Sequence, residues 1–203
     1  MKKLFLVFLL LGVVIKVSAQ DDKQKKHEVR AFYGETFQLD FANALTDALT
    51  NIFSTHYKTS SNVYGAFGLG YRYNINRFKV GGDVSYIAYR SNVAMKKGGE
   101  ADYKTSDNNF IVLPSAEFVY FKRGILELYG GAGVGAFVSL SKSSPITPEG
   151  KKYLNNNLND KSVNLAYQIN PIAIRLGTGT VGGFLELGYG MKGLVNLGVS
   201  FKF

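Results

Sequence analysis

The side chains best suited to nucleophilic or acid–base chemistry are few in this chain of 203 residues, which has two histidines and no cysteine. One histidine, His56, lies close in sequence to residues that could complete a Ser-His-Asp triad: Ser54, Ser60, Ser61, Asp40 and Asp47. Their spacing implies no shared geometry, and Ser, Thr and Asp are ordinary residues of loops. We therefore assign no catalytic residue, and we expect neither a metal site nor another cofactor.

A second group of candidates consists of single charges inside otherwise apolar segments. Four of them are acidic and could in principle act as paired catalytic carboxylates: Asp83, Glu117, Glu127 and Glu186. Four are basic and occur in similar surroundings: Arg30, Arg72, Arg175 and Lys202. Because acids and bases are distributed together over many segments, a structural ion network is the favoured interpretation.

The segments that carry these charges alternate between apolar and polar residues with a period of two, which is typical of β-strands. The clearest is 193–203, where Val195, Leu197, Val199, Phe201 and Phe203 share one face and Lys202 lies on the other. Similar alternation predicts seven more strands, over 27–35, 63–74, 78–89, 109–121, 124–139, 163–176 and 181–192. A change of parity at Pro171 indicates a β-bulge. Most of the strands have roughly 9 to 13 residues, enough to cross a bilayer when tilted.

The connections between these strands alternate in length. The long ones are 36–61, 91–107 and 141–161, and the short ones are 74–77, 122–124 and 177–180. Strands that run up and down would place all long loops at one end, as in a transmembrane β-barrel. Charges facing lipid cost about 2–4 kcal/mol each at the bilayer midplane, so we expect the eight isolated charges to face the lumen and pair there. An eight-stranded barrel is filled by such side chains.

The first residues have a different pattern. Lys2 and Lys3, the apolar stretch 4–15 and the sequence Ser18-Ala19-Gln20 have the layout of a secretory signal peptide. We expect a signal peptide over 1–19 and one barrel domain over 20–203. Loss of three lysines with the signal peptide lowers the formal net charge from +9 to +6, which is too moderate to indicate a nucleic-acid partner.

Two features are expected in the long loops. A short helix is predicted in the first loop, over 40–54, with an apolar face that packs on the barrel rim or lies on the membrane: Phe41, Leu45, Leu49, Ile52 and Phe53. The pairs Lys96-Lys97 and Lys151-Lys152 either contact phosphate groups of lipopolysaccharide or are solvated loop charges.

The final hairpin carries a resemblance to a known family. Glu186-Leu187-Gly188-Tyr189-Gly190 continues through Lys192-Gly193 to Gly198-Val199-Ser200-Phe201-Lys202-Phe203, and this resembles the closing hairpin of outer-membrane β-barrels of Gram-negative bacteria, in particular the small OmpX-type and OmpA-transmembrane-type barrels. The resemblance implies an integral outer-membrane protein with periplasmic termini, surrounded by lipid that includes lipopolysaccharide. It also implies a C-terminal signal to the barrel-assembly machinery, formed by Val199, Phe201 and Phe203.

We therefore expect an all-β, eight-stranded, antiparallel up-and-down transmembrane barrel without enzymatic activity, which acts structurally or through its external loops. Three alternatives stay open at this point. A lipid-modifying barrel enzyme would use His56, since lipid A deacylases and palmitoyl transferases resemble one another in combining His with Ser. A porin-like channel for small solutes would need an open lumen. A secreted lipocalin-like binder would bury its apolar face inside the barrel.

Overall fold

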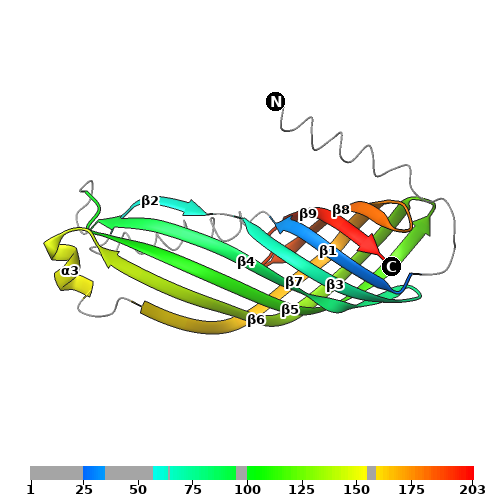
Figure 1. Cartoon of the computed structure of the whole chain (residues 1–203), viewed down its shortest axis with the longest axis horizontal. Coiled ribbons are helices and arrows are strands. Elements are labelled where there is room, and N and C mark those ends of the chain that lie inside the picture. Colours follow the sequence, from blue (N-terminus) through cyan, green and yellow to red (C-terminus); the bar gives the residue numbers. More distant parts are fainter. Residues whose placement is uncertain (1–24, 35–56, 64, 95–99, 155–158) are drawn as a thin grey trace, which may run out of the picture.

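The computed structural model describes residues 25–34, 57–63, 65–94, 100–154 and 159–203. These residues form one antiparallel sheet that closes into a barrel (Figure 1). The elements, in chain order, are β1 (His27–Gly34), β2 (Tyr57–Val63), β3 (Ala66–Ile75), β4 (Phe78–Ala94), β5 (Tyr103–Arg123), β6 (Leu126–Pro145), α3 (Pro148–Leu154), β7 (Asn159–Gly177), β8 (Val181–Gly190) and β9 (Val195–Lys202).

The described strands make eight positions around the ring, because β2 and β3 share one of them. Both pair with β4: β3 along residues 78–86 and β2 along residues 89–94. From there each strand pairs with the next, β9 returns to β1, and β1 pairs with β3, which closes the barrel. The predicted fold, an eight-stranded antiparallel up-and-down barrel, is confirmed.

The predicted irregularity at Pro171 is also present. The register of β7 shifts against β8 between Ile169 and Ile172. It also shifts against β6, where Asn170 and Ala173 pair with Gly131 and Tyr129, so β7 carries the extra residue on both sides. Two consecutive residues, Pro171 and Ile172, are both exposed. The bulge therefore changes which parity of β7 faces the lumen, and it keeps apolar residues outside on both sides of the shift.

Four strands are longer than the sequence predicts. The lengths of β4, β5, β6 and β7 are 17, 21, 20 and 19 residues, whereas β1, β8 and β9 have 8, 10 and 8. Much of 91–107 and 141–161, predicted as loop, is strand, and that prediction was wrong. These extensions consist mainly of Ser, Thr, Asn, Lys and Asp, so they show no apolar stripe although their backbones still pair.

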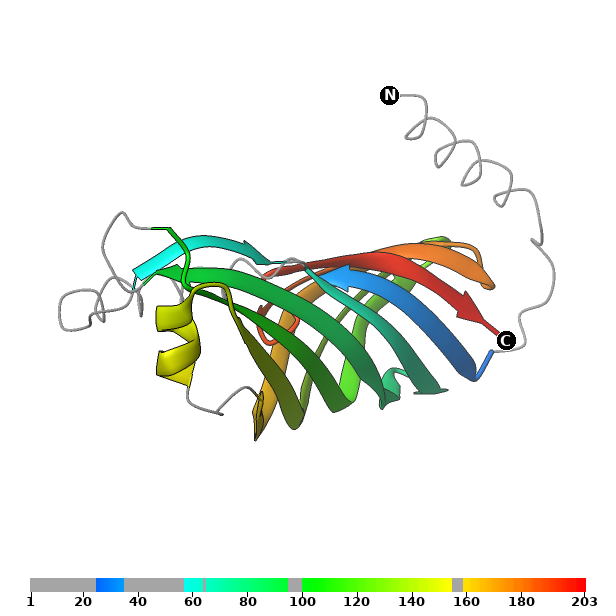
Figure 2. The ribbon, with the colours of Figure 1, turned by 60° about the vertical axis from the view of Figure 1, so that its left-hand side comes forward.

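The long strands project beyond the rest of the barrel at one end (Figures 1 and 2). We call this part, residues 57–63, 89–94, 103–109, 138–145 and 159–166, the protruding sheet. Both chain termini of the barrel, at β1 and β9, lie at the opposite end, which is also the end of the short turns. The barrel therefore has two different ends, a sheet that projects and a ring of tight turns.

The outer wall of the barrel is apolar and has aromatic residues near both ends. Aliphatic side chains such as Leu69, Val84 and Val199 are exposed on it. Toward the protruding sheet, ring pairs join Tyr33 with Phe67, Tyr86 with Phe110 and Tyr167 with Tyr189. Toward the short turns, further pairs join Phe78 with Phe118, Phe118 with Tyr120 and Phe201 with Phe203. Two aromatic bands flanking an aliphatic belt are characteristic of a barrel in a bilayer.

The only helix among the described residues is α3, in the connection between β6 and β7. Its first turn is joined to the preceding chain by Thr147, whose hydroxyl donates to Asp102 and accepts from the Gly150 amide. The helix predicted over 40–54, with Phe41, Leu45, Leu49, Ile52 and Phe53, lies outside the described residues. In the described part of the chain, no helix has the length and apolarity required to traverse a bilayer.

Candidate functional site

The lumen contains a buried network of charged side chains. The structure buries all eight charges singled out in the sequence, namely Arg30, Arg72, Asp83, Glu117, Glu127, Arg175, Glu186 and Lys202. It adds three that were not singled out: Glu28, Lys79 and Lys192. Glu28 lies two residues before Arg30 in β1, and Lys79 lies four residues before Asp83 in β4. Each therefore points to the same side of its strand as that charge, so the alternation of the sequence could have identified both. Lys192 also falls on the same face as Glu186 in the predicted strand 181–192, although the structure places it in the turn after β8.

At the centre of the lumen, one carboxylate is shared by two arginines. Glu117 in β5 accepts two hydrogen bonds from Arg30 in β1, at 2.8 and 2.8 Å, and one from Nε of Arg72 in β3, at 2.6 Å. The same Arg30 also donates to Glu28 at 2.9 Å and to Glu186 in β8 at 3.2 Å. Charge-assisted bonds of this kind are stronger than neutral ones, and a bidentate pair also fixes the orientation of both groups. Glu117 thus connects the two opposite halves of the sheet across the lumen.

On the side of the protruding sheet, the network continues through Asp83. Arg72 donates to both carboxylate oxygens of Asp83, at 2.8 and 3.0 Å. Lys192, from the β8–β9 turn, reaches down to the same Asp83 at 2.7 Å and to Glu186 at 3.3 Å. Glu186 also accepts hydrogen bonds from the Tyr129 hydroxyl at 3.0 Å and from the Asn170 amide at 2.8 Å. The β8–β9 hairpin is therefore held over the lumen by its own lysine.

On the side of the short turns, two lysines share two carboxylates. Lys79 in β4 is paired with Glu127 and lies 3.4 Å from Glu28. Lys202 in β9 lies 2.9 Å from Glu127 and 3.7 Å from Glu28. With these pairs, every strand position of the ring contributes a charge to the network. A buried carboxylate without a cation would be costly, and the mutual pairing removes that cost.

Arg175 is the exception in this network. Its Nε donates to the Ser200 hydroxyl at 2.7 Å and its Nη1 to the Thr178 carbonyl at 3.2 Å, whereas the nearest carboxylate, Glu28, is 4.0 Å away. Its Nη2 is buried and has no hydrogen-bond partner. The buried network holds six cationic and five acidic residues, and Arg175 is the cation that is least neutralised.

The middle of the lumen is filled. Glycines face the network, and a Cβ added to Gly131 would lie 2.7 Å from Cγ of Glu117. The Tyr129 ring packs between Arg30 and Lys79, with its centroid 5.3 Å from the guanidinium carbon and 4.8 Å from the ammonium nitrogen. A cavity of only about 10 Å³ is left between Arg72, Glu117, Tyr129 and their neighbours, which is about the space of one water molecule. The described residues therefore form a plug and leave no passage at this level.

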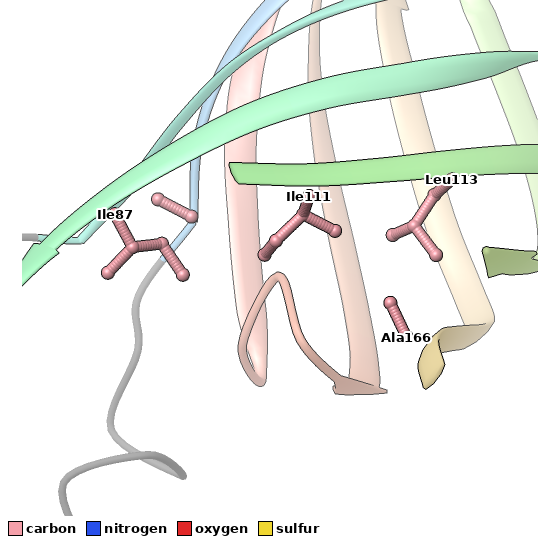
Figure 3. Packing of buried hydrophobic residues seen from close by; sticks show 5 residues of the cluster. Ile87, Ile111, Leu113 and Ala166 are labelled. Carbon is pink, nitrogen blue, oxygen red and sulfur yellow. The ribbon is translucent and has the colours of Figure 1, made fainter. Parts of the chain in front are cut away.

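Above the plug, toward the protruding sheet, the lumen becomes apolar. Ala66, Ile87, Ile111, Leu113 and Ala166 form a buried cluster (Figure 3). Phe137 and Met191 pack against this cluster and are only partly buried. The apolar layer separates the ion network from water at that end and so strengthens its electrostatic interactions.

Below the plug, toward the short turns, the lumen opens into a cavity of about 450 Å³. We call this cavity the vestibule. Its wall includes six basic residues, Lys25, Arg77, Lys79, Lys122, Arg175 and Lys202, and one acidic residue, Glu127. The two ends of the lumen thus differ in kind, since one is closed by apolar side chains and the other is a basic hollow.

The remaining candidates are not brought together into a site. His56, Ser54, Asp40 and Asp47 lie outside the described residues, and Ser60 and Ser61 lie in β2. His27, the other histidine, is at the start of β1, where Nδ1 is 2.7 Å from the Tyr71 hydroxyl and the ring stacks on Phe203. Lys96 and Lys97 lie outside the described residues, and Lys151 and Lys152 are exposed on α3.

The buried acids and bases of the lumen neutralise one another. Asp83, Glu117, Glu127 and Glu186 are all paired with cations. The cavity beside Asp83, Glu117 and Glu186 measures only about 10 Å³, whereas Glu127 lines the vestibule. Within the described part of the chain, no cluster of three potential metal ligands of the His, Cys, Asp or Glu type is present. Val199, Phe201 and Phe203, predicted to act as an assembly signal, are exposed along the outer face of β9 and at the residue after it.

Comparisons with known proteins concern the fold. No protein-family model and no curated protein matches the sequence. Among solved structures, the chain is similar to Ail, the attachment invasion locus protein of Yersinia pestis, with 13% identity, a TM-score of 0.45 and coverage of 88% of this chain and 99% of that chain.

Two further structures are similar to the same extent. Ail in complex with the heparin analogue sucrose octasulfate matches with 15% identity, a TM-score of 0.44 and coverage of 88% and 99%. The N-terminal β-barrel domain of Pseudomonas aeruginosa OprF matches with 14% identity, a TM-score of 0.41 and coverage of 89% and 98%. The eight-stranded barrel is established by the strand pairing of this chain itself.

Proposed function

We propose that this protein is an integral β-barrel of the outer membrane of a Gram-negative bacterium that conducts no solute and acts through contacts of its protruding sheet outside the cell. The observation that carries the proposal is the contrast between a plugged, ion-paired lumen and an apolar outer wall. A soluble barrel would show the opposite arrangement, with apolar residues inside and charges in water.

The membrane location is supported by the outer wall. Large apolar side chains are exposed on every strand of the barrel whose side chains are described, Leu69 to 68% and Val84 to 55%, for example. In water such a continuous belt would be an aggregation hazard. In a bilayer it is the surface expected between two aromatic bands.

The surface role is supported by the free edge of β7. Along residues 159–166, β7 pairs with β6 on one side, and no described strand pairs with its other side, because β8 first pairs at Gln168. The Tyr167 carbonyl accepts from the Met191 amide on the β8 side, so the backbone groups of Val163 and Leu165, which have the same parity, also point to the free edge. An exposed edge of this kind can accept a strand from another protein.

The orientation can be tested by labelling, because the chain has no cysteine of its own. Ser162→Cys places a thiol on the protruding sheet, and Gly179→Cys places one in the exposed β7–β8 turn, where an added Cβ meets no atom within 4 Å. A membrane-impermeant maleimide should label the first variant in intact cells and the second only after the outer membrane is permeabilised. Labelling of Gly179→Cys alone in intact cells would reverse the proposed orientation.

The closed lumen is tested by planar-bilayer recording of the purified protein. We expect no stable ohmic conductance steps, because the lumen narrows to a cavity of about 10 Å³ at the ion network. Reproducible unitary steps would show that the plug opens and would favour the channel alternative.

The role of the free edge is tested with two proline substitutions. Val163→Pro removes an amide that faces the edge, whereas Asn164→Pro removes one that faces β6 and should destabilise the sheet. Cells that display the protein should attach to protein-coated glass or clump more than cells that lack it. We expect Val163→Pro to remove this difference while the gel mobility shift of the folded barrel is retained. Full attachment by Val163→Pro would overturn the role of this edge.

A further inference from the structure

The vestibule is a candidate binding site that is separate from the protruding sheet, at the opposite end of the barrel. We propose that it binds a phosphate-class oxyanion with at least two negative charges, such as a pyrophosphate group or a phosphorylated headgroup. Three features of the vestibule support this ligand class: the size of the cavity, its charge balance and one buried guanidinium nitrogen without a partner.

Three turns and one end of the network form the wall of the vestibule. Arg77 comes from the β3–β4 turn, Lys122 from the end of β5 and Thr178 and Gly179 from the β7–β8 turn. Lys25 precedes β1 and donates a hydrogen bond to the Thr180 hydroxyl. A volume of about 450 Å³ lies within the usual range of small-molecule sites, about 300–1,000 Å³.

The charge of this wall is not neutralised by the protein. Glu127 is its one acidic member, and Lys79 and Lys202 both bind that carboxylate. In the described part of the chain, Lys25, Arg77 and Lys122 form no ion pair with a carboxylate. Several positive charges that converge on one concave surface raise the local concentration of anions.

Arg175 supplies the specific feature of the site. The residue is only 3% exposed, and its guanidinium is held in place by Ser200 and the Thr178 carbonyl. Its Nη2 nevertheless lacks a hydrogen-bond partner although Arg175 lines the vestibule. An unsatisfied buried donor on a charged group is unfavourable. Nη2 lies against Gly182, so a phosphate oxygen in the vestibule would accept from it after a small rotation of the guanidinium and would then remove this penalty.

The geometry favours phosphate over a carboxylate as the ligand class. A guanidinium presents its donors in a planar fork that fits two oxygens of a phosphate, and lysines add charge from other directions around a tetrahedral group. The cations lie on several sides of the vestibule, since they come from the start of the barrel domain, from β4, β5, β7 and β9 and from the β3–β4 turn. A ligand with more than one phosphate oxygen exposed in different directions can contact several of them together.

The proposal is tested by titrating inorganic pyrophosphate into the folded protein in octyl glucoside, a detergent without phosphate. NMR amide signals of Thr178, Gly179 and Thr180 should shift and reach saturation, and added salt should weaken the binding. Arg175→Gln should weaken the affinity by about tenfold or more, the usual effect of losing a charge-assisted hydrogen bond.

A second variant keeps the test valid if Arg175→Gln does not fold. Arg77→Gln combined with Lys122→Gln changes only the rim of the vestibule and should also weaken binding by about tenfold or more. The matched control, Lys151→Gln combined with Lys152→Gln, removes two charges from α3 at the far end and should leave the affinity unchanged. Equal binding by the wild type and the rim variant, or no saturable shift at all, would overturn the proposal.

A parallel arm distinguishes the two sources of phosphate. Nanodiscs with phosphatidylglycerol are compared with octyl glucoside micelles in the absence of pyrophosphate. Shifts of the same Thr178–Thr180 signals in the nanodiscs, reduced in the rim variant, would identify a lipid headgroup as the ligand. Unchanged signals, with pyrophosphate still binding in the nanodiscs, would identify a free phosphate compound. Either result supports the site, whereas lipid-induced shifts that are equal in the rim variant would argue against it.

Discussion

The barrel wall and the protruding sheet are parts of the same strands, yet their sequences look different. In the barrel wall, Val84 faces outward and its neighbours Asp83 and Ser85 face the lumen, so apolar and polar residues alternate strictly. In the protruding sheet, β5 and β6 consist mainly of polar residues, such as Thr105, Lys142 and Ser143, without this alternation. The backbone pairing is continuous through both regions.

This difference shows that the alternation of apolar and polar residues depends more on what surrounds a strand than on the formation of the strand. We place the outer side of the wall in hydrocarbon, where a charge is expensive. We place the protruding sheet in water, where backbone pairing is the main constraint on the residue type. The two regions should therefore respond differently to the same substitution.

The largest difference is expected for the centre of the ion network. Glu117→Gln removes the carboxylate charge that Arg30 and Arg72 share, and it leaves both guanidinium groups buried and less well paired. We expect a loss of about 3–5 kcal/mol in the free energy of unfolding, measured by guanidinium titration with circular dichroism in lipid vesicles. The control Glu149→Gln, exposed on α3, should change the free energy of unfolding little. An equal effect of the two substitutions would show that the network does not stabilise the barrel.

The cost in unfolding free energy of adding a charge to the outer face should differ between the barrel wall and the protruding sheet. Val84→Arg lies between the aromatic bands and should cost about 2–4 kcal/mol of unfolding free energy in lipid vesicles. Val163→Arg, on the protruding sheet, is exposed to a similar degree, 62% against 55% for Val84, and should cost less than about 0.5 kcal/mol. Similar costs at both positions would mean that both surfaces face the same surroundings. That result would contradict the placement of Val84 in lipid and Val163 in water.

A smaller effect is expected from adding a methyl group inside the barrel. A Cβ on Gly182 would lie 2.7 Å from Cζ of Arg175, whereas a Cβ on the adjacent Gly183 would meet only the Gly198 carbonyl, at 3.8 Å. Gly182→Ala should therefore lower the free energy of unfolding by about 1–3 kcal/mol through overpacking. Gly183→Ala should have little effect in the same titration. A larger loss in Gly183→Ala would invalidate the assignment of inward and outward faces in β8.

The strands of the barrel wall could be predicted from the sequence because alternate residues face two different surroundings. One set lines the polar lumen, and the other lies on the outer side that we place in lipid. Parity identified the strands and the inward direction of Arg72 and Glu186, and it predicted the bulge at Pro171. It did not predict which acid contacts which base. The partners of Glu117, for example, come from β1 and β3, and their meeting depends on the closure of the ring.

The protruding sheet and the vestibule could not be predicted in the same way. The extensions of β4 to β7 consist mainly of polar residues and carry little periodic signal, with Val163 and Leu165 in β7 as exceptions. The pairing of their backbones reveals them. The vestibule collects residues from separate turns, such as Arg77, Lys122 and Thr178, whose proximity is a property of the closed barrel. Lys192 falls on the same face as Glu186 in the predicted strand 181–192, but the structure ends β8 at Gly190 and places Lys192 in the turn.

The measurement that tests the central claim most directly is the accessibility of spin labels on single cysteines, since the chain contains none. Labels at Leu187 and Val199, on the outer wall, are compared with a label at Val163 on the protruding sheet, in reconstituted lipid. We predict that Leu187 and Val199 are more accessible to oxygen than to a water-soluble nickel complex, and that Val163 shows the reverse. A higher accessibility of Leu187 and Val199 to the nickel complex would place the wall in water and contradict the proposed membrane location.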